Sequence, residues 1–141
     1  MPLAKITFAT PADPARRDLA SRAVHRAIVD ALGVPEKDLF QILRDADAAE
    51  VRYDSEYMLE GRRDADFVIL EITLSLGRTL ELKRNLYRAV VDNLVAALGI
   101  TPSNVFVTLY EVAKENFSFG EGRAQLADLP WPPLPAAPAS P

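Results

Sequence analysis

Two segments of the chain, 66 residues apart, carry the same residue pattern, and this internal repeat constrains the fold more than any other feature. Residues 31–40 (ALGVPEKDLF) align without a gap with residues 97–106 (ALGITPSNVF). The same offset carries residues 5–8 (KITF) onto residues 71–74 (EITL). An ungapped match in two places indicates that one supersecondary unit occurs twice in the chain.

The first copy of the repeat has the pattern of a strand, a helix and a second strand. Alternating apolar residues predict a strand over 3–8. Asp13 and Pro14 then supply a capping side chain and a proline suited to the first helical turn. An apolar stripe at helical spacing continues to Gly33, which is typical of a helix C-terminus. The second strand is expected over 39–43.

The second copy follows the same order. We expect a strand over 67–75, a helix capped by Thr79 and ended by Gly99, and a fourth strand over 104–111. A strand–helix–strand unit closes with a right-handed crossover and parallel strands. The sequence therefore predicts an α+β fold of two fused β-α-β repeats, with a four-stranded sheet and two helices on one face.

The domain organisation follows from the repeat. One domain is expected over residues 1–129, with repeat halves at about 2–45 and 67–111, a connection at 46–66 and an aromatic-glycine loop at 116–123. Residues 130–141 include six prolines and are expected to form a proline-rich C-terminal tail, since proline cannot continue a helix or an inner strand.

The strand expected over 67–75 carries apolar side chains on both faces. Leu70 and Ile72 alternate with Ile69 and Glu71. Because two helices cover only one face of the sheet, the other face should be buried against another subunit. We therefore expect an oligomer.

The composition excludes several classes of function. There is no cysteine and only one histidine, which rules out disulfides, thiolate nucleophiles and multi-histidine metal sites. A net charge of −4 without clustered basic residues argues against nucleic acid as a partner. No apolar run is long enough to span a membrane and no signal-peptide pattern is present, so a cytoplasmic protein is expected.

Pro2 becomes a chemically unusual group once Met1 is removed, as normally happens before a small second residue. The product is a secondary amine. Free α-amino groups have pKa values of about 7.7–8.0, and an apolar pocket or a nearby arginine lowers them. Such an amine can act as a base near neutral pH. Proline is also common at this position, but here Pro2 should begin an inner strand, where the amine would be held in place.

Arg78 and Asp38 are expected beside Pro2. Arg78 follows the third strand, at the strand end where ligands bind in open α/β sheets, and a guanidinium can hold a carboxylate. Asp38 opens the second strand, where it could orient a water molecule or accept a proton. A turn residue is the alternative interpretation of Asp38.

Four further residues are candidate substrate contacts. Ser75 and Tyr53 could make polar contacts. Phe117 and Phe119 lie among small residues and glycines, a pattern that favours a tight loop over an apolar group. A hairpin packed on its own subunit is the alternative.

Together, these features resemble the tautomerase superfamily, in particular the branch that contains malonate semialdehyde decarboxylase. The resemblance covers about residues 2–128. It rests on the opening Met-Pro-Leu, the Gly-Val-Pro-Glu-Lys-Asp turn at 33–38, the Gly-Arg-Thr junction at 77–79 and the Phe-Ser-Phe-Gly-Glu-Gly-Arg loop at 117–123. It implies a homotrimer with its active site around the terminal proline.

The resemblance also implies roles for particular residues. Asp38 matches the aspartate that assists the proline in the decarboxylase, and Arg78 matches the second of two arginines that bind and polarise its substrate. Leu76 stands where the first arginine would be. The loss of that arginine argues against decarboxylation as the main activity.

The expected function is therefore a cofactor-free and metal-free keto–enol tautomerase, an isomerase acting on a small 2-oxo or enol acid. Pro2 would move the proton, Arg78 would hold the carboxylate, and Phe117 and Phe119 would exclude water. The alternative enzyme is a lyase that decarboxylates a 3-oxo acid of the malonate semialdehyde type with protonated Pro2. A further alternative is a non-enzymatic oligomeric binding protein that uses the proline-rich tail.

Overall fold

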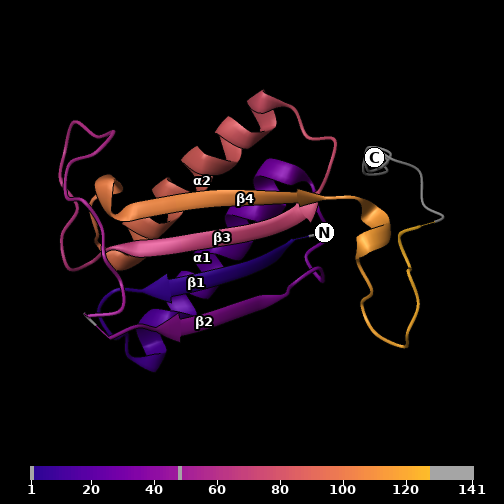
Figure 1. The fold of residues 1–141 in the computed structure, drawn as a ribbon, viewed down its shortest axis with the longest axis horizontal. Helices are drawn as coiled ribbons and strands as arrows, with labels where there is room; N and C mark the ends of the chain where they lie inside the picture. Colours follow the sequence, from indigo (N-terminus) through magenta and orange to yellow (C-terminus); the bar gives the residue numbers. More distant parts are fainter. Residues whose placement is uncertain (1, 48, 128–141) are drawn as a thin grey trace, which may run out of the picture.

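The computed structural model describes residues 2–47 and 49–127, and its elements follow the repeat (Figure 1). The strands and helices are β1 (Leu3–Phe8), α1 (Pro14–Leu32), β2 (Gln41–Asp45), β3 (Val68–Ser75), α2 (Leu80–Leu98) and β4 (Val105–Val112), with short 3-10 helices η1 (Pro102–Asn104) and η2 (Lys114–Asn116). Both helices begin and end at positions that differ by the repeat offset of 66 residues. The predicted order of elements is confirmed.

Equivalent residues cap the two helices. The Asp13 carboxylate accepts a hydrogen bond from the backbone N–H of Arg16, and the Thr79 hydroxyl accepts one from the backbone N–H of Leu82. At the other end, Gly33 and Gly99 adopt φ angles of 68° and 69°, the left-handed region that favours glycine. The capping interpretation of the sequence is therefore confirmed for both helices.

The sheet has the strand order β2-β1-β3-β4. Each repeat contributes one parallel pair, β1 with β2 and β3 with β4, and the antiparallel pair β1–β3 joins the repeats at the centre. The position of β1 between two neighbours confirms that Pro2 precedes an inner strand. Strand β2 begins two residues later than expected, although the Phe40 carbonyl already accepts a hydrogen bond from the Ala4 N–H.

The core lies between the sheet and the helices, which pack side by side behind the sheet in Figure 1. Alternate residues of the two central strands, from Ala4 to Phe8 on β1 and from Val68 to Leu74 on β3, point into it. Val24 and Ile28 of α1 and Leu86, Val90 and Leu94 of α2 fill it from the other side. Each such side chain contributes about 1.5–3 kcal/mol of burial free energy.

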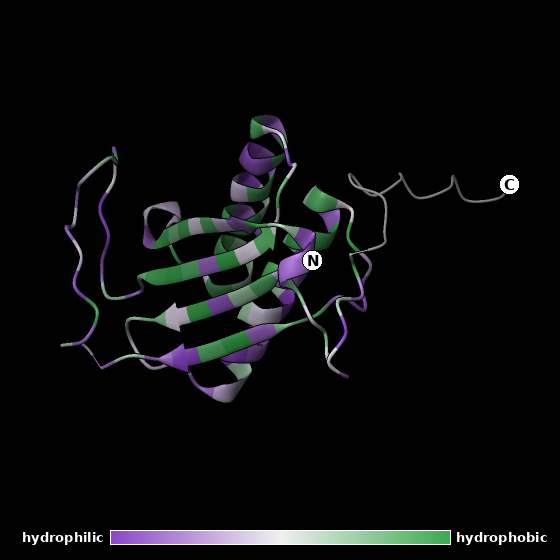
Figure 2. Cartoon of the chain, turned by 45° about the vertical axis from the view of Figure 1, so that its right-hand side comes forward, coloured by the Kyte–Doolittle hydropathy of each residue, from purple (hydrophilic) through white to green (hydrophobic). Residues whose placement is uncertain are grey.

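The opposite face of the sheet carries no helix, and hydrophobic and hydrophilic residues alternate along its strands (Figure 2). Ile42, Phe106 and Tyr110 are 43%, 45% and 49% exposed. We call this surface the open face. Large apolar side chains on such a surface are typical of a contact with another protein chain.

Asn104, a buried residue of η1, anchors the connection between the repeats. Its side-chain oxygen accepts a hydrogen bond of 2.8 Å from the Asp64 N–H, and its amide donates to the Asp64 carboxylate at 2.9 Å. The predicted proline-rich tail, residues 130–141, lies outside the described residues. Within the described ranges, no helix has the length and apolar character needed to cross a membrane.

Candidate active site

Pro2 is buried directly before β1, at an edge of the sheet where several chain ends meet. Leu3 is paired with Thr73 near the end of β3, and Ala4 is paired with Gln41 at the start of β2. Strand β4 runs parallel to β3, so its C-terminal end lies at the same edge. The topology thus brings Pro2 close to Asp38, to the segment from Ser75 to Arg78 and to the chain that follows β4.

Asp38 is the buried carboxylate of this edge, with 7% of its surface exposed. Its backbone N–H donates to the Pro35 carbonyl at 3.0 Å, which fixes the turn before β2. Burial raises the pKa of Asp38 above its ordinary value, while the positive charges of His25 and Arg78 oppose that rise. Asp38 and Arg78 therefore interact electrostatically.

Arg78 is half-buried in the turn between β3 and α2. Its Nη1 donates a hydrogen bond of 2.9 Å to the Ser75 carbonyl, which ties the guanidinium to the end of β3. Burial lowers the pKa of Arg78, and the negative charges of Glu111 and Asp38 favour its protonated form. The edge therefore holds a cation that is tied to the end of β3 and interacts with two carboxylates.

Ser75 is the last residue of β3 and is only 1% exposed. Its hydroxyl oxygen is buried and has no hydrogen-bond partner among the described residues. Leaving a buried polar group unpaired costs about 1–3 kcal/mol. The hydroxyl can therefore bond to a group that enters the site without giving up a bond within the chain.

An aromatic loop lies over the same edge. The rings of Phe117 and Phe119 are stacked with their centroids 6.0 Å apart, and Phe119 packs on Phe40 at 5.5 Å. The Gln125 side chain secures the loop, because it accepts from the Phe119 N–H at 3.0 Å and donates to the Gly120 carbonyl at 2.9 Å. The aromatic-glycine pattern therefore belongs to a loop that covers the start of β2.

Phe40 is a member of this site that the sequence interpretation missed. It is 44% exposed, two residues beyond Asp38, and it is the ring against which the loop packs. The available signal was the repeat itself, because Phe40 and Phe106 occupy equivalent positions in the two copies.

Tyr53 lies at the opposite end of the sheet. Its hydroxyl donates to the Asp64 carbonyl at 2.8 Å, and its ring packs on Phe67 at 4.6 Å. Phe67 directly precedes the first residue of β3, whereas Ser75 is its last, a separation of about 25 Å at roughly 3.3 Å per residue. Within one chain, the fold does not bring Tyr53 together with the other candidates.

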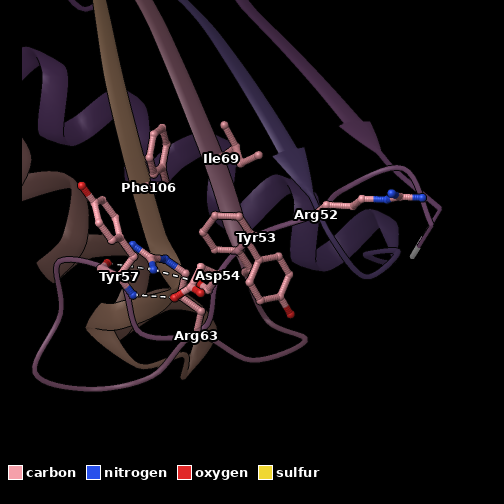
Figure 3. Close-up of a pocket in the computed structure, with 8 residues that line it drawn as sticks. Arg52, Tyr53, Asp54, Tyr57, Arg63, Ile69 and Phe106 are labelled. Atoms are coloured by element: carbon pink, nitrogen blue, oxygen red, sulfur yellow. Dashed lines mark hydrogen bonds between the residues drawn. The ribbon is translucent and has the colours of Figure 1, made fainter.

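Tyr53 instead lines an open pocket of about 280 Å³ (Figure 3). The lining residues are Arg52, Tyr53, Asp54, Tyr57, Arg63, Phe67, Ile69 and Phe106. Arg63 lies 5.9 Å from the centroid of the Phe67 ring and donates hydrogen bonds to the backbone carbonyls of Asp54 and Tyr57. This arrangement ties the connection between the repeats to the start of β3.

The pocket is the counterpart of the Pro2 site in the second repeat. At the offset of 66 residues, Asn104 replaces Asp38, Phe106 replaces Phe40 and Val68 replaces Pro2. Val68 is inside the chain, so its nitrogen is an amide without basicity. Asn104 is already bonded to the connection. The repeat thus produces two similar edges, and the second differs from the first because it has a backbone amide at Val68 and a neutral side chain at Asn104.

Known proteins match the chain along most of its length. Residues 38–120 match the family described as "Tautomerase enzyme". The chain is 35% identical over 108 residues to the probable tautomerase YusQ of Bacillus subtilis (strain 168), covering 77% of this chain and 84% of that protein. It is 27% identical over 125 residues to the probable tautomerase YrdN of the same organism, covering 89% and 95%.

Solved structures of similar proteins also match the chain along most of its length. FG41 malonate semialdehyde decarboxylase inhibited by 3-bromopropiolate superimposes with a TM-score of 0.82 and 31% identity, over 88% of this chain and 93% of that chain. A structure described as a symmetric trimer of wild-type Q0 fused 4-OT has a TM-score of 0.73 and 26% identity, over 89% and 97% of the two chains.

Proposed function

The chain belongs to the tautomerase family, in the branch similar to malonate semialdehyde decarboxylase, and from this premise we propose that it is a cofactor-free keto–enol tautomerase. The substrate is a small 2-oxo or enol carboxylic acid. The observation that carries the proposal is the convergence of Pro2, Asp38 and Arg78 at one edge of the sheet, under an aromatic loop.

Removal of Met1 creates the reactive group. While Met1 is attached, the Pro2 nitrogen is an amide and cannot accept a proton. After removal it is a secondary amine. Its burial and the positive charge of Arg78 favour the neutral form that acts as a base, and the Asp38 carboxylate favours the protonated form that returns the proton. The neutral amine takes a proton from the hydroxyl or carbon of one tautomer and returns it to the other atom.

The surrounding side chains bind the substrate and orient the amine. Arg78 holds the carboxylate through charge-assisted hydrogen bonds. Asp38 orients the amine or a water molecule, and the Ser75 hydroxyl donates to an oxygen of the substrate. Phe117 and Phe119 exclude water, which strengthens the electrostatic interactions in the site.

We further propose that the working form is a homotrimer. Fused 4-OT structures with the same fold are described as trimers, and the open face of this chain exposes Ile42, Phe106 and Tyr110. In such an assembly, Tyr53 could contact substrate only across a subunit boundary, since its own chain places it at the far end of β3.

A lyase activity is the second candidate, because a malonate semialdehyde decarboxylase is similar over most of the chain. In that reaction, protonated Pro2 would polarise the carbonyl of a 3-oxo acid. Tautomerase activity should rise as Pro2 loses its proton, whereas decarboxylase activity should fall. The pH profile therefore separates the two reactions.

The test is a substrate panel assayed with wild type and Pro2→Ala, after mass spectrometry has confirmed that Met1 is absent from both. The panel contains phenylenolpyruvate, 2-hydroxymuconate and malonate semialdehyde. We expect the tautomerase kcat/KM to fall about 100-fold or more in the variant, the range typical of a lost general acid–base group. Equal rates in the two proteins would overturn the mechanism.

A further inference from the structure

We infer that the substrate carries a single carboxylate and an apolar substituent, aromatic or branched, and that Leu76 is the residue that sets this preference. The inference rests on the proposed function, because it describes the ligand of the same site. It follows from the distribution of charge and of exposed apolar surface around Arg78.

The charges of the site suit one substrate carboxylate. Arg78 is tied to the end of β3 and lies in the field of Asp38 and Glu111. Lys83, the nearby cation of α2, forms an ion pair with Glu111. A carboxylate bound at Arg78 gains a partner, but a second carboxylate beside it would lie close to Asp38 and Glu111, whose negative charges oppose its binding and add to the cost of its lost hydration.

Several large apolar side chains are exposed around this edge. Three of them lie close to Asp38 and Arg78 in the sequence and expose about half of their surface: Leu39 (49%), Phe40 (44%) and Leu76 (50%). Phe119 packs on Phe40 and stacks with Phe117, so the aromatic loop continues the same surface. An apolar substituent would displace water from this surface, which favours binding.

Leu76 is positioned to select between the two kinds of substrate. Its N–H donates to the Val112 carbonyl at 2.9 Å, which holds its backbone in the continuation of the β3–β4 ladder. It is separated from Arg78 only by Gly77. A cation at position 76 would add a second anchor for a carboxylate beside Arg78, and the leucine instead extends the apolar surface.

The experiment compares kcat/KM for phenylenolpyruvate, a monocarboxylate with an aryl group, and 2-hydroxymuconate, a dicarboxylate. Wild type should prefer phenylenolpyruvate by about tenfold or more, and Leu76→Arg should shift the ratio toward 2-hydroxymuconate by about tenfold, the effect of one added charge-assisted hydrogen bond. Leu19→Arg is the matched control, since Leu19 is 43% exposed on α1 and outside the site. It should leave the ratio unchanged.

A second measurement does not depend on the folding of a variant. Wild type is inhibited with 3-phenylpropionate and with adipate, which resemble the two substrates but cannot react, and the first should bind about tenfold more tightly. A wild-type preference for the dicarboxylates would overturn the inference. A folded Leu76→Arg protein with an unchanged ratio would overturn the role of Leu76.

These failures differ from a failure of the proposed function. If the dicarboxylate were preferred but its turnover still required Pro2, only the inference on substrate class would be lost. If wild type and Pro2→Ala turned over every substrate equally, the tautomerase mechanism itself would be lost.

Discussion

At the scale of a single residue, burial of the Asp38 carboxylate is the clearest energetic penalty in the candidate site. A carboxylate that is only 7% exposed loses hydration, and burial is the main reason for its raised pKa. The counterpart in the second repeat is Asn104, which has the same shape without a charge and makes hydrogen bonds to Asp64 and to the Thr101 hydroxyl. The repeat therefore places a neutral amide at one position and a buried carboxylate at the equivalent one, and the proposed function assigns the charge of Asp38 a role in the chemistry.

Replacement of Asp38 by asparagine should therefore separate stability from activity. A raised pKa means that the folded protein binds the proton more tightly than the unfolded chain, so stability is lost as pH rises from about 4 through the folded pKa. The asparagine side chain of the variant does not titrate, so the variant does not lose this stability as pH rises. The Tm of Asp38→Asn minus the Tm of wild type should therefore increase with pH over this range. At neutral pH, the kcat/KM of the variant should be lower than that of wild type by about tenfold. A Tm difference that is flat or falls with pH would contradict the account.

The sequence was sufficient to group Pro2, Asp38, Ser75 and Arg78, because each lies at the end of a strand whose direction follows from the repeat. It was insufficient for Phe40, whose contact with Phe119 joins segments far apart in the chain. Tyr53 is a candidate from sequence because it lies in a long connection, and connections of that length are often functional. The length of a connection does not specify which end of the sheet it covers.

At the scale of elements, the helices are the best-determined part of the chain. Both ends of each helix have a local signal, a capping side chain or a glycine with positive φ, and these signals act within one turn. The bounds of the strands at the sheet edges were predicted less well. Strand β2 ends at Asp45 because of its pairing with Phe8, a partner distant in sequence.

The two N-caps provide a matched pair of variants. Asp13→Ala and Thr79→Ala should each lower the free energy of unfolding by about 1 kcal/mol, measured by urea denaturation. Thr79 directly follows Arg78, so fraying of α2 should also raise KM several-fold in Thr79→Ala. Asp13 caps α1 at the other end of the sheet, and its variant should keep the wild-type KM. Equal KM values in the two variants would mean that the α2 cap does not position Arg78.

At the scale of the whole molecule, the two repeats are related by an approximate two-fold axis through the antiparallel β1–β3 pair. This symmetry places equivalent edges at opposite ends of the sheet, one with Pro2 and one with the Tyr53 pocket. It also leaves one face of the sheet without helices. The fold therefore places the Pro2 edge and the Tyr53 pocket at opposite ends of the sheet and leaves the open face uncovered by helices.

The mass of the particle in solution tests the assembly. We expect three times the chain mass of 15.5 kDa by light scattering. Phe106→Asp should dissociate the trimer, because a charge on the open face cannot be buried without a partner. Leu19→Asp is the control, since Leu19 has a similar exposure of 43% but lies on α1. A monomeric wild type, or equal assembly of both variants, would contradict the trimer proposal.

The most direct test of the central claim is the ionisation of the Pro2 amine itself. The protein is prepared with ¹⁵N-labelled proline and without Met1, and the chemical shift of the Pro2 nitrogen is followed against pH by NMR. The titration midpoint should coincide with the rise of kcat/KM for phenylenolpyruvate, with activity increasing as the amine loses its proton. A kcat/KM that does not change at this midpoint, or that falls as Pro2 becomes neutral, would contradict the proposal that Pro2 is the catalytic base.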